Sequence, residues 1–497
     1  MQEKTYLKWY NKVGYGSGDI AGNVVYAFLS SFVMIYLTNT VGLNPGIVGS
    51  LIAASKFFDG ITDIFFGSMI DKTKSRLGKA RPWMLYAYIG CAVTLVAIFA
   101  VPADLGATAQ YVWFFIAYTL LNAVFYTANN IAYSALTALV TRNSKERVQM
   151  GSCRFIFAFG TSLLIQSVTI GAVARFGGGA AGWRTVAILY AGIGLVVNTI
   201  SVLSVKELPE EELRGAGSRE EVYGSGMPEE LYETGIPENQ GLEIRETPGA
   251  REIQESLRNQ EVGETQEVYG LVAAAKLLAA NRFYLMICGV YILQQVYTAM
   301  VNMGIYYMTY VLKNENLYGV FSWAMNIPLI AALVVTPSLV SRWKGMYKLN
   351  LRGYMLGTLG RALVVVAGYL GSVPLMLLFT GVAALGQGPW QGDMNAVIAS
   401  CSEYTYLTQK KRVDGTMYSC TSLGVKLGGG LGTAIAGWML AASGFDGALA
   451  VQPESCIRML YFMYLWLPMG INLVITVILS QMNVEGANER LRNGVKA

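Results

Sequence analysis

The stretch from residue 20 to residue 38, IAGNVVYAFLSSFVMIYLT, contains no charged side chain. A helix of about 20 apolar residues is about 30 Å long, which matches the hydrocarbon core of a bilayer. Similar runs recur along the whole chain of 497 residues, and the charged residues gather between them. Only 14% of the residues are charged, compared with about 25% in soluble domains. The sequence therefore predicts an all-α membrane protein that crosses the bilayer many times.

The apolar runs predict twelve transmembrane helices in two sets of six. The first set covers residues 16–38, 44–70, 82–102, 109–139, 151–174 and 184–205. The second set covers residues 283–311, 318–341, 350–371, 374–402, 416–443 and 456–481. We therefore expect an N-terminal half at 1–205, a C-terminal half at 271–482 and a tail at 483–497, in an internally repeated architecture.

The basic residues of the loops alternate from one side of the predicted bundle to the other. If the N-terminus is cytoplasmic, the cytoplasmic loops carry many Lys and Arg residues, among them Lys72, Lys74, Arg142, Lys145, Arg342, Lys344, Lys410 and Lys411. The opposite loops carry few, namely Arg175, Arg184, Lys313 and Arg458. This distribution follows the positive-inside rule. It predicts an even number of spans with both termini in the cytoplasm, and the first span, which lacks a cleavage site, is expected to be retained.

Residues 206–270 interrupt the apolar pattern between the two halves. They contain 17 Glu, no Asp and 6 Lys or Arg. A segment of this composition buries too little apolar surface to fold alone. We predict a flexible, acidic cytoplasmic loop, and a partner-binding role for this loop is the alternative.

Composition also excludes several classes of function. The chain has no His, and its six Cys form no C-x-x-C pair, so neither a His-ligated metal nor a redox motif is expected. No nucleophile–base set or nucleotide-binding loop occurs, which argues against an enzyme. The net charge of +5 follows the membrane topology and does not indicate nucleic-acid binding. No cofactor is expected beyond a coupling ion, Na⁺ or H⁺.

Two carboxylates lie within the second predicted span, in the segment SKFFDGITD at 55–63. Asp59 and Asp63 are four residues apart, so they share one face of a helix. Each charge inside a membrane costs about 2.5–3.5 kcal/mol, and two carboxylates repel each other unless a cation joins them. We predict a cation site at Asp59 and Asp63, to which Thr62 adds a hydroxyl oxygen. The alternative is a static ion pair with Lys56 or with a basic residue of another span.

Polar residues in the first and fourth spans suggest a second kind of site. Asp19 lies in GYGSGDIAGN at 14–23, and the segment YTANNIAYS carries a stripe made of Tyr126, Thr127, Asn129, Asn130 and Tyr133. Carboxylates and amides hydrogen-bond to sugar hydroxyls, and aromatic rings stack against a pyranose. Such residues also join helices in membranes, so helix packing is the alternative. Arg154 and Lys426 are further candidates for the cavity, Trp390 is a candidate ring platform, and Glu403 is expected to be a gate or helix-end residue.

These segments together resemble one family. The chain resembles the glycoside–pentoside–hexuronide:cation symporters of the major facilitator superfamily, which include the melibiose and glucuronide permeases. The elements that carry the resemblance are GSGDIAGN, FDGITD, DKTKSRLGKARPW and SEYTYLTQKKRVDGTMYSCTSLGVKLGGGLG. The resemblance implies a monomeric, cation-coupled glycoside transporter in the bacterial inner membrane, surrounded by lipid. A transporter of a non-sugar solute and a transporter-like sensor remain the alternatives.

The resemblance also implies roles for individual residues. Asp59 and Asp63 match the cation-site acids of the second span, and Thr127 matches a hydroxyl that joins them. Asp19 and Arg154 match sugar-contacting positions. Lys426 matches a lysine near both sites, and Trp390 falls near an aromatic residue that closes the cavity. Tyr126 and Tyr133 belong to the same predicted substrate site.

Three positions depart from the melibiose branch of the family. Thr62 stands where that branch has Asn, which leaves Na⁺ and H⁺ both open as coupling ions. Tyr406 replaces the second acid of an E-Y-G-E motif. Asn130 stands where that branch has a sugar-binding Asp, so a negative charge is missing beside Arg154.

The Asn130 difference generates a first prediction. A missing carboxylate favours an anionic glycoside, so Asn130→Asp is expected to shift the preference from a glucuronide toward the matching neutral glucoside. Uptake of the two glycosides by the variant and the unmodified protein measures the shift. An unchanged ratio would show that this position does not set the charge preference.

Overall fold

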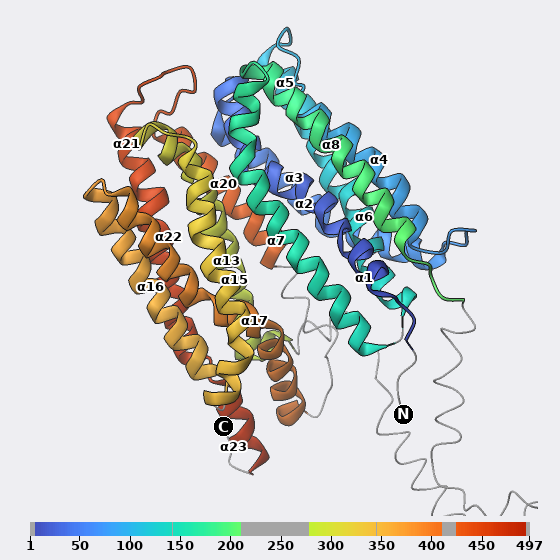
Figure 1. Cartoon of the computed structure of the whole chain (residues 1–497). Coiled ribbons are helices and arrows are strands. Elements are labelled where there is room, and N and C mark those ends of the chain that lie inside the picture. Colours follow the sequence, from blue (N-terminus) through green and yellow to red (C-terminus); the bar gives the residue numbers. More distant parts are fainter. Residues whose placement is uncertain (1–4, 142, 210–277, 344, 410–423, 494–497) are drawn as a thin grey trace, which may run out of the picture. The chain divides into compact units, whose positions relative to one another are not determined.

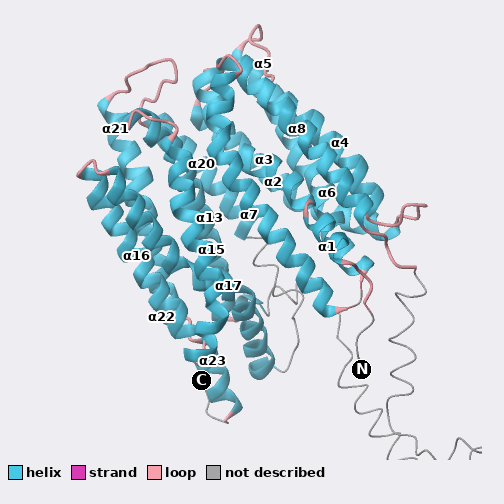
Figure 2. Ribbon diagram, in the orientation of Figure 1, coloured by secondary structure: helices cyan, strands magenta, loops and turns pink. Residues whose placement is uncertain are grey.

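The computed structural model describes residues 5–141, 143–209, 278–343, 345–409 and 424–493. Within these ranges every regular element is a helix (Figure 2). This confirms the predicted all-α class. The chain divides into one compact unit, formed by Met1–Glu207 with Leu278–Ala497, and a second unit, Leu208–Leu277. The predicted acidic loop at 206–270 therefore lies almost wholly outside the described residues.

Each half of the first unit contributes six long helical segments. In the N-terminal half the elements are α1 (Trp9–Gly16), α2 (Gly18–Ile35), η1 (Tyr36–Thr40), α3 (Pro45–Lys72), α4 (Arg81–Ile98), α5 (Ala107–Thr119), η2 (Leu120–Tyr126), α6 (Thr127–Val140), α7 (Ser144–Arg175) and α8 (Gly179–Ser204). In the C-terminal half they are α13 (Arg282–Asn302), α14 (Gly304–Tyr306), η4 (Tyr307–Val311), α15 (Leu317–Trp343), α16 (Tyr347–Tyr369), α17 (Val373–Gln409), η5 (Gly424–Gly428), α20 (Gly429–Ala442), α21 (Glu454–Tyr461), η6 (Phe462–Trp466), α22 (Leu467–Gln481) and α23 (Val484–Arg492). Figure 1 shows the two sets of helices, and α1 and α23 lie at the same end of the bundle.

Ten helical segments of the described ranges are long and apolar enough to span a membrane. The predicted second and ninth spans correspond to α3 and α16, which are 28 and 23 residues long. Their charged residues lower their hydropathy, but their length suffices to cross a bilayer. Within the described residues the observed helices thus agree with the positions of the twelve predicted spans, and residues 416–423 of the eleventh span lie outside them.

Several spans contain a short π-helical turn. These turns are η1, η2, η4, η5 and η6. A π turn inserts an extra residue into a helix and is frequent at functional sites. Here η2 ends immediately before Thr127, and η5 contains Lys426.

The two halves contact each other near the ends of the spans that lie away from α1 and α23. The Thr38 hydroxyl, at the far end of the first span, lies 2.7 Å from the Tyr306 hydroxyl. The Trp438 indole donates a hydrogen bond of 2.8 Å to Ser50. Between these polar contacts α3 and α20 pack through small residues, as membrane helices do when their backbones approach closely.

Gly437 is the tightest point of this packing. A Cβ atom at Gly437 would lie 2.3 Å from the carbonyl oxygen of Pro45 and 3.1 Å from the Cα of Gly49. The close approach of α3 and α20 therefore requires glycine at this position.

Gly437→Ala is expected to destabilise the folded protein by about 1–3 kcal/mol, because the added methyl group overpacks the interface. Gly470→Ala is the matched control, since nothing lies within 4 Å of a Cβ atom placed there and alanine is the better helix former. Thermal unfolding of both purified variants measures the difference. Equal melting temperatures would contradict the interface described above.

Candidate functional site

Asp19, Arg154 and Tyr133 form one group although they come from three helices. The Nε atom of Arg154, on α7, lies 2.6 Å from Oδ2 of Asp19, on α2. The Tyr133 hydroxyl, on α6, is 3.1 Å from the same oxygen. The guanidinium carbon of Arg154 lies 4.1 Å from the centre of the Tyr133 ring. The structure therefore brings together three of the predicted substrate residues.

The group depends on close backbone approach at the break between α1 and α2. A Cβ atom at Gly18 would lie 2.9 Å from the ring of Tyr133. The Tyr133 hydroxyl also lies 2.8 Å from the carbonyl oxygen of Tyr15, and the Tyr15 hydroxyl donates to the carbonyl oxygen of Tyr133 at 2.8 Å. These reciprocal bonds fix the ring beside the ion pair.

A second group joins the two halves at Asp59. The Thr127 hydroxyl donates a hydrogen bond of 2.5 Å to Oδ1 of Asp59. Lys426, on η5 of the other half, donates its ammonium group to the backbone carbonyl of Asp59 at 2.9 Å. The predicted cation-site residues Asp59 and Thr127 are thus adjacent, and Lys426, predicted to lie near both sites, is bonded to the backbone of Asp59.

The other two residues of the predicted cation site are less directly placed. The Thr62 hydroxyl donates to the backbone carbonyl of Asp59 at 3.1 Å, so it is engaged within its own helix. Asp63 belongs to α3, but its side chain lies outside the described atoms. A site shared by Asp59 and Asp63 therefore stays a prediction.

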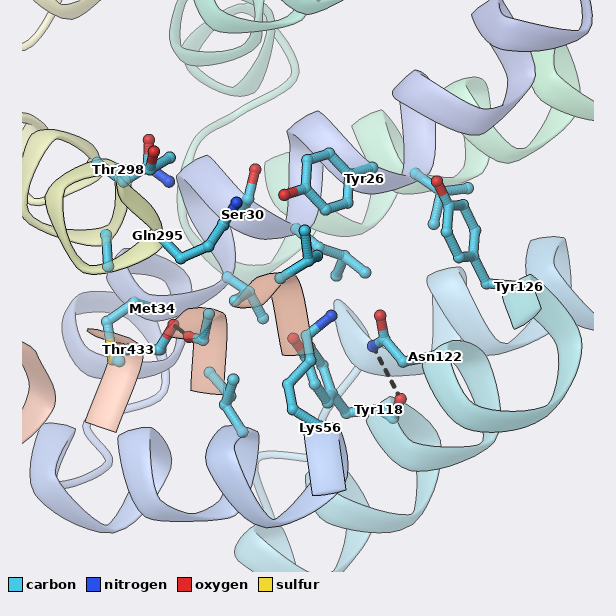
Figure 3. A pocket seen from close by; sticks show the side chains of 18 of the residues that line it. Tyr26, Ser30, Met34, Lys56, Tyr118, Asn122, Tyr126, Gln295, Thr298 and Thr433 are labelled. Atoms are coloured by element: carbon cyan, nitrogen blue, oxygen red, sulfur yellow. Dashed lines mark hydrogen bonds between the residues drawn. The ribbon is translucent and has the colours of Figure 1, made fainter. Parts of the chain in front are cut away.

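A cavity opens between the two halves (Figure 3). Its walls come from α2, α3, α5 and η2 on one side and from α13, η5 and α20 on the other. Its polar lining consists of Tyr26, Ser30, Lys56, Tyr118, Asn122, Tyr126, Gln295, Thr298, Asn302 and Thr433. In Figure 3, Lys56, Tyr118 and Asn122 lie opposite Gln295 and Thr298.

The sequence-based selection missed the wall that α13 contributes. Gln295, Thr298 and Asn302 are spaced by three and four residues, so they share one helix face. This polar stripe in an otherwise apolar span is the sequence signal by which they could have been found. Of the predicted substrate residues, Tyr126 lines the cavity, while Asn130 lies on α6 with an exposed side chain.

Trp390 and Glu403 lie away from this cavity. The Trp390 ring is only 1% exposed and packs edge-on against Tyr354. It lines a different, smaller cavity together with Asn350. Glu403, near the end of α17, accepts a hydrogen bond of 3.0 Å from Arg492 of α23, which is a helix-end position.

Glu146 anchors the segment that precedes α1 to the start of α7. Its carboxylate accepts backbone N–H bonds from Tyr6 and Leu7 at 3.2 and 3.0 Å, and a hydroxyl bond from Thr141 at 2.6 Å. Lys12 lies 3.3 Å away. Burial raises the pKa of the Glu146 carboxyl, but the hydrogen bonds outweigh it and hold that pKa below its ordinary value. Glu146 thereby ties the segment before α1 to α7, the helix that carries Arg154.

The chain is similar to known transport proteins over most of its length. The family described as MFS/sugar transport protein matches residues 14–225 and 249–486. The chain is 24% identical over 472 residues to the isoprimeverose transporter of Lactiplantibacillus pentosus, covering 94% of this chain and 86% of that protein. It is 25% identical over 461 residues to the glucuronide carrier protein homolog of Escherichia coli K12, covering 90% and 87%.

Solved structures share the fold. The chain is similar to a bacterial homolog of the lysosomal transporter Spinster, with a TM-score of 0.61, 13% identity and coverage of 99% of each chain. It is also similar to a D-xylose-proton symporter, with a TM-score of 0.58, 16% identity and coverage of 95% and 97%. At these identities the likeness concerns the fold alone.

The depressed pKa of Glu146 leads to a pH-dependent prediction. The carboxylate stabilises the folded state fully above the ordinary Glu pKa of about 4.3, and this stabilisation is lost as the pH falls through the lower, folded-state pKa. Glu146→Gln is therefore expected to lower the melting temperature at pH 7, and the difference from the unmodified protein is expected to shrink in acid. The exposed Glu454→Gln is the control. A difference that is equally large at pH 7 and pH 3 would contradict this role.

Proposed function

Because the chain belongs to the MFS/sugar transport protein family, the glycoside–pentoside–hexuronide:cation symporters, we propose that it transports a glycoside, pentoside or hexuronide together with Na⁺ or H⁺. The observation that carries this proposal is the cavity between the two halves. It combines tyrosine rings with amide and hydroxyl groups from both halves, which are the groups that sugar hydroxyls and pyranose faces bind.

Asp19 and Arg154 extend the proposed substrate site. The side chains of Asp19 and Arg154 in this ion pair remain 16% and 25% exposed. An ion pair of this kind offers acceptors and donors side by side, and hydrogen bonds to charged groups are stronger than neutral ones. A sugar with adjacent hydroxyls is able to bind both partners at once.

The contacts of Asp59 support the proposed cation coupling. A cation that binds at Asp59, Asp63 and Thr127 neutralises carboxylates on α3. Because Lys426 is bonded to the Asp59 backbone, binding of the cation also affects the C-terminal half. Each ligand then raises the affinity of the other, and thermodynamic linkage makes the effect reciprocal.

Alternating access is the proposed mechanism. The contacts between the halves, such as Thr38 with Tyr306, lie at the ends of the spans away from α1 and α23. When one half rocks against the other about the central cavity, the cavity closes on one side of the membrane and opens on the other, as in other transporters built from repeats. By the loop charges, α1 and α23 face the cytoplasm of a bacterial cell, and one monomer suffices for this cycle.

Two other functions remain distinguishable by experiment. A transporter of a non-sugar solute on this fold would show cation-driven uptake but reject every glycoside. A transporter-like sensor would lack uptake altogether and would lose its signal when residues 215–265 are deleted.

Uptake into energised membrane vesicles tests the proposal. Neutral and anionic glycosides are supplied with a Na⁺ gradient, with a pH gradient or with neither. Gradient-dependent accumulation of a glycoside is the expected result. Folded protein that accumulates none of the glycosides would refute the proposal.

Asp59→Asn is expected to abolish gradient-driven accumulation, because an amide carries no charge to hold the cation and cannot take up the proton. Asp63→Cys is expected to do the same. Exchange of labelled for unlabelled glycoside checks that the substrate site of each variant survives. Asp104→Asn, in an exposed loop, is the control. Normal accumulation by the Asp59 and Asp63 variants would exclude the proposed coupling site.

A further inference from the structure

Arg361 is a buried cation within the C-terminal half. It lies in the middle of α16 and is only 2% exposed. Among the residues that the structure describes, no carboxylate forms an ion pair with it, and its Nε atom has no hydrogen-bond partner. A buried charge without a counter-charge is strongly unfavourable, and an intramembrane ionisable residue is a functional candidate for that reason.

Within the part of the chain that the structure describes, neutral groups alone hold the guanidinium in place. The hydroxyl of Tyr297 accepts a hydrogen bond from Arg361, and the ring centre of Tyr297 lies 4.9 Å from the guanidinium carbon. Gln387 donates to the same hydroxyl at 3.2 Å and to the side-chain oxygen of Asn472 at 3.3 Å. This network orients the guanidinium group but does not neutralise its charge.

Arg361 lines a second, smaller cavity. Thr380, whose buried hydroxyl also lacks a partner among the described residues, lines the same cavity. Gln166 from the N-terminal half and Ser322 from the C-terminal half form another part of the wall, where Ser322 is bonded to Gln166. Asn302 lines both this cavity and the central one, so the two are neighbours.

We propose that this second cavity is an anion subsite in which Arg361 and Thr380 bind a carboxylate group of the transported solute, while the sugar ring occupies the central cavity. The inference rests on the proposed transport function and adds a residue that recognises the negative charge of the solute. A carboxylate offers the acceptor oxygens that the free Nε–H of Arg361 and the Thr380 hydroxyl lack. Arginine matches the planar geometry of a carboxylate and forms strong, charge-assisted bonds with it.

The position of the cavity favours a transported anion over a permanently bound one. Its wall includes Gln166 and Ser322, which join the two halves at a contact that must open during alternating access. An anion bound there is released when this contact opens. A free inorganic anion such as chloride is also negatively charged, so the experiment must distinguish a free anion from the carboxylate of the solute.

Binding to the purified full-length protein in detergent tests the subsite without any ion gradient. Phenyl β-glucuronide and phenyl β-glucoside form a matched pair that differs in a carboxylate. The unmodified protein is expected to bind the glucuronide at least about tenfold more tightly. Arg361→Gln is expected to abolish most of this preference while changing glucoside affinity much less, and Arg361→Lys is expected to restore part of it. Arg458→Gln, at an exposed position, is the control and is expected to keep the preference.

Other results would overturn the assignment. An unmodified protein that does not prefer the glucuronide, or an Arg361→Gln variant that loses both sugars equally, contradicts it. Chloride that stabilises the unmodified protein but not the variant, without any preference between the sugars, assigns the subsite to a free anion instead. If Arg361→Gln does not fold, Thr380→Val is used, and it is expected to weaken glucuronide binding selectively. Glucuronide binding and uptake that depend on Arg361 but on no cation gradient would refute coupling and leave the subsite standing.

Discussion

Charge in a medium of low polarity is the constraint on which the rest of this structure depends. A charge in the hydrocarbon core needs a partner, and the protein supplies different partners in different places. Arg154 has the carboxylate of Asp19, and Asp59 has the hydroxyl of Thr127. Arg361 has only the hydroxyl and ring of Tyr297 among the described residues. The charges with the least protein compensation are therefore the places where a ligand gains most by binding.

Close packing of small residues makes these charged groups meet. Glycines in α3 and α20 let the two helices approach until a carbonyl oxygen of one occupies the space of a missing side chain of the other. This approach places Lys426 within hydrogen-bonding distance of the Asp59 backbone. The polar contact between the halves is thus a consequence of the apolar packing beside it.

Much of the fold and part of the site could be predicted from the sequence. Apolar runs located the helices, because span length and hydropathy are local properties. Motif resemblance selected Asp19, Arg154, Asp59 and Thr127, and the structure places them in two contacting pairs. Trp390 shows the limit, because residue type does not determine which way a side chain faces, and its ring lies in a separate cavity.

The polar stripe of α13 was overlooked for a related reason. Gln295 and Asn302 are uncharged, so they do not stand out as intramembrane charges do, although their helical spacing was readable. Arg361 carried a stronger signal, since it lies in the middle of a predicted span, yet none of the four segments that carry the family resemblance contains it. The sequence does not show whether an acidic residue from another helix pairs with Arg361. Only the folded structure shows that, within the described residues, its hydrogen-bond partners are neutral.

The two proposed ion sites have opposite signs and belong to opposite halves. A cation at Asp59 compensates negative charge in the N-terminal half, and a carboxylate at Arg361 compensates positive charge in the C-terminal half. When both are bound, a carboxylate of the N-terminal half and a guanidinium group of the C-terminal half have each gained a counter-charge before the halves rock past each other. With one bound, a buried charge must still cross the changing interface, which is unfavourable in a low-dielectric environment. A solute that carries its own negative charge would therefore strengthen coupling through electrostatics, since the fully loaded protein moves with less penalty than either half-loaded form.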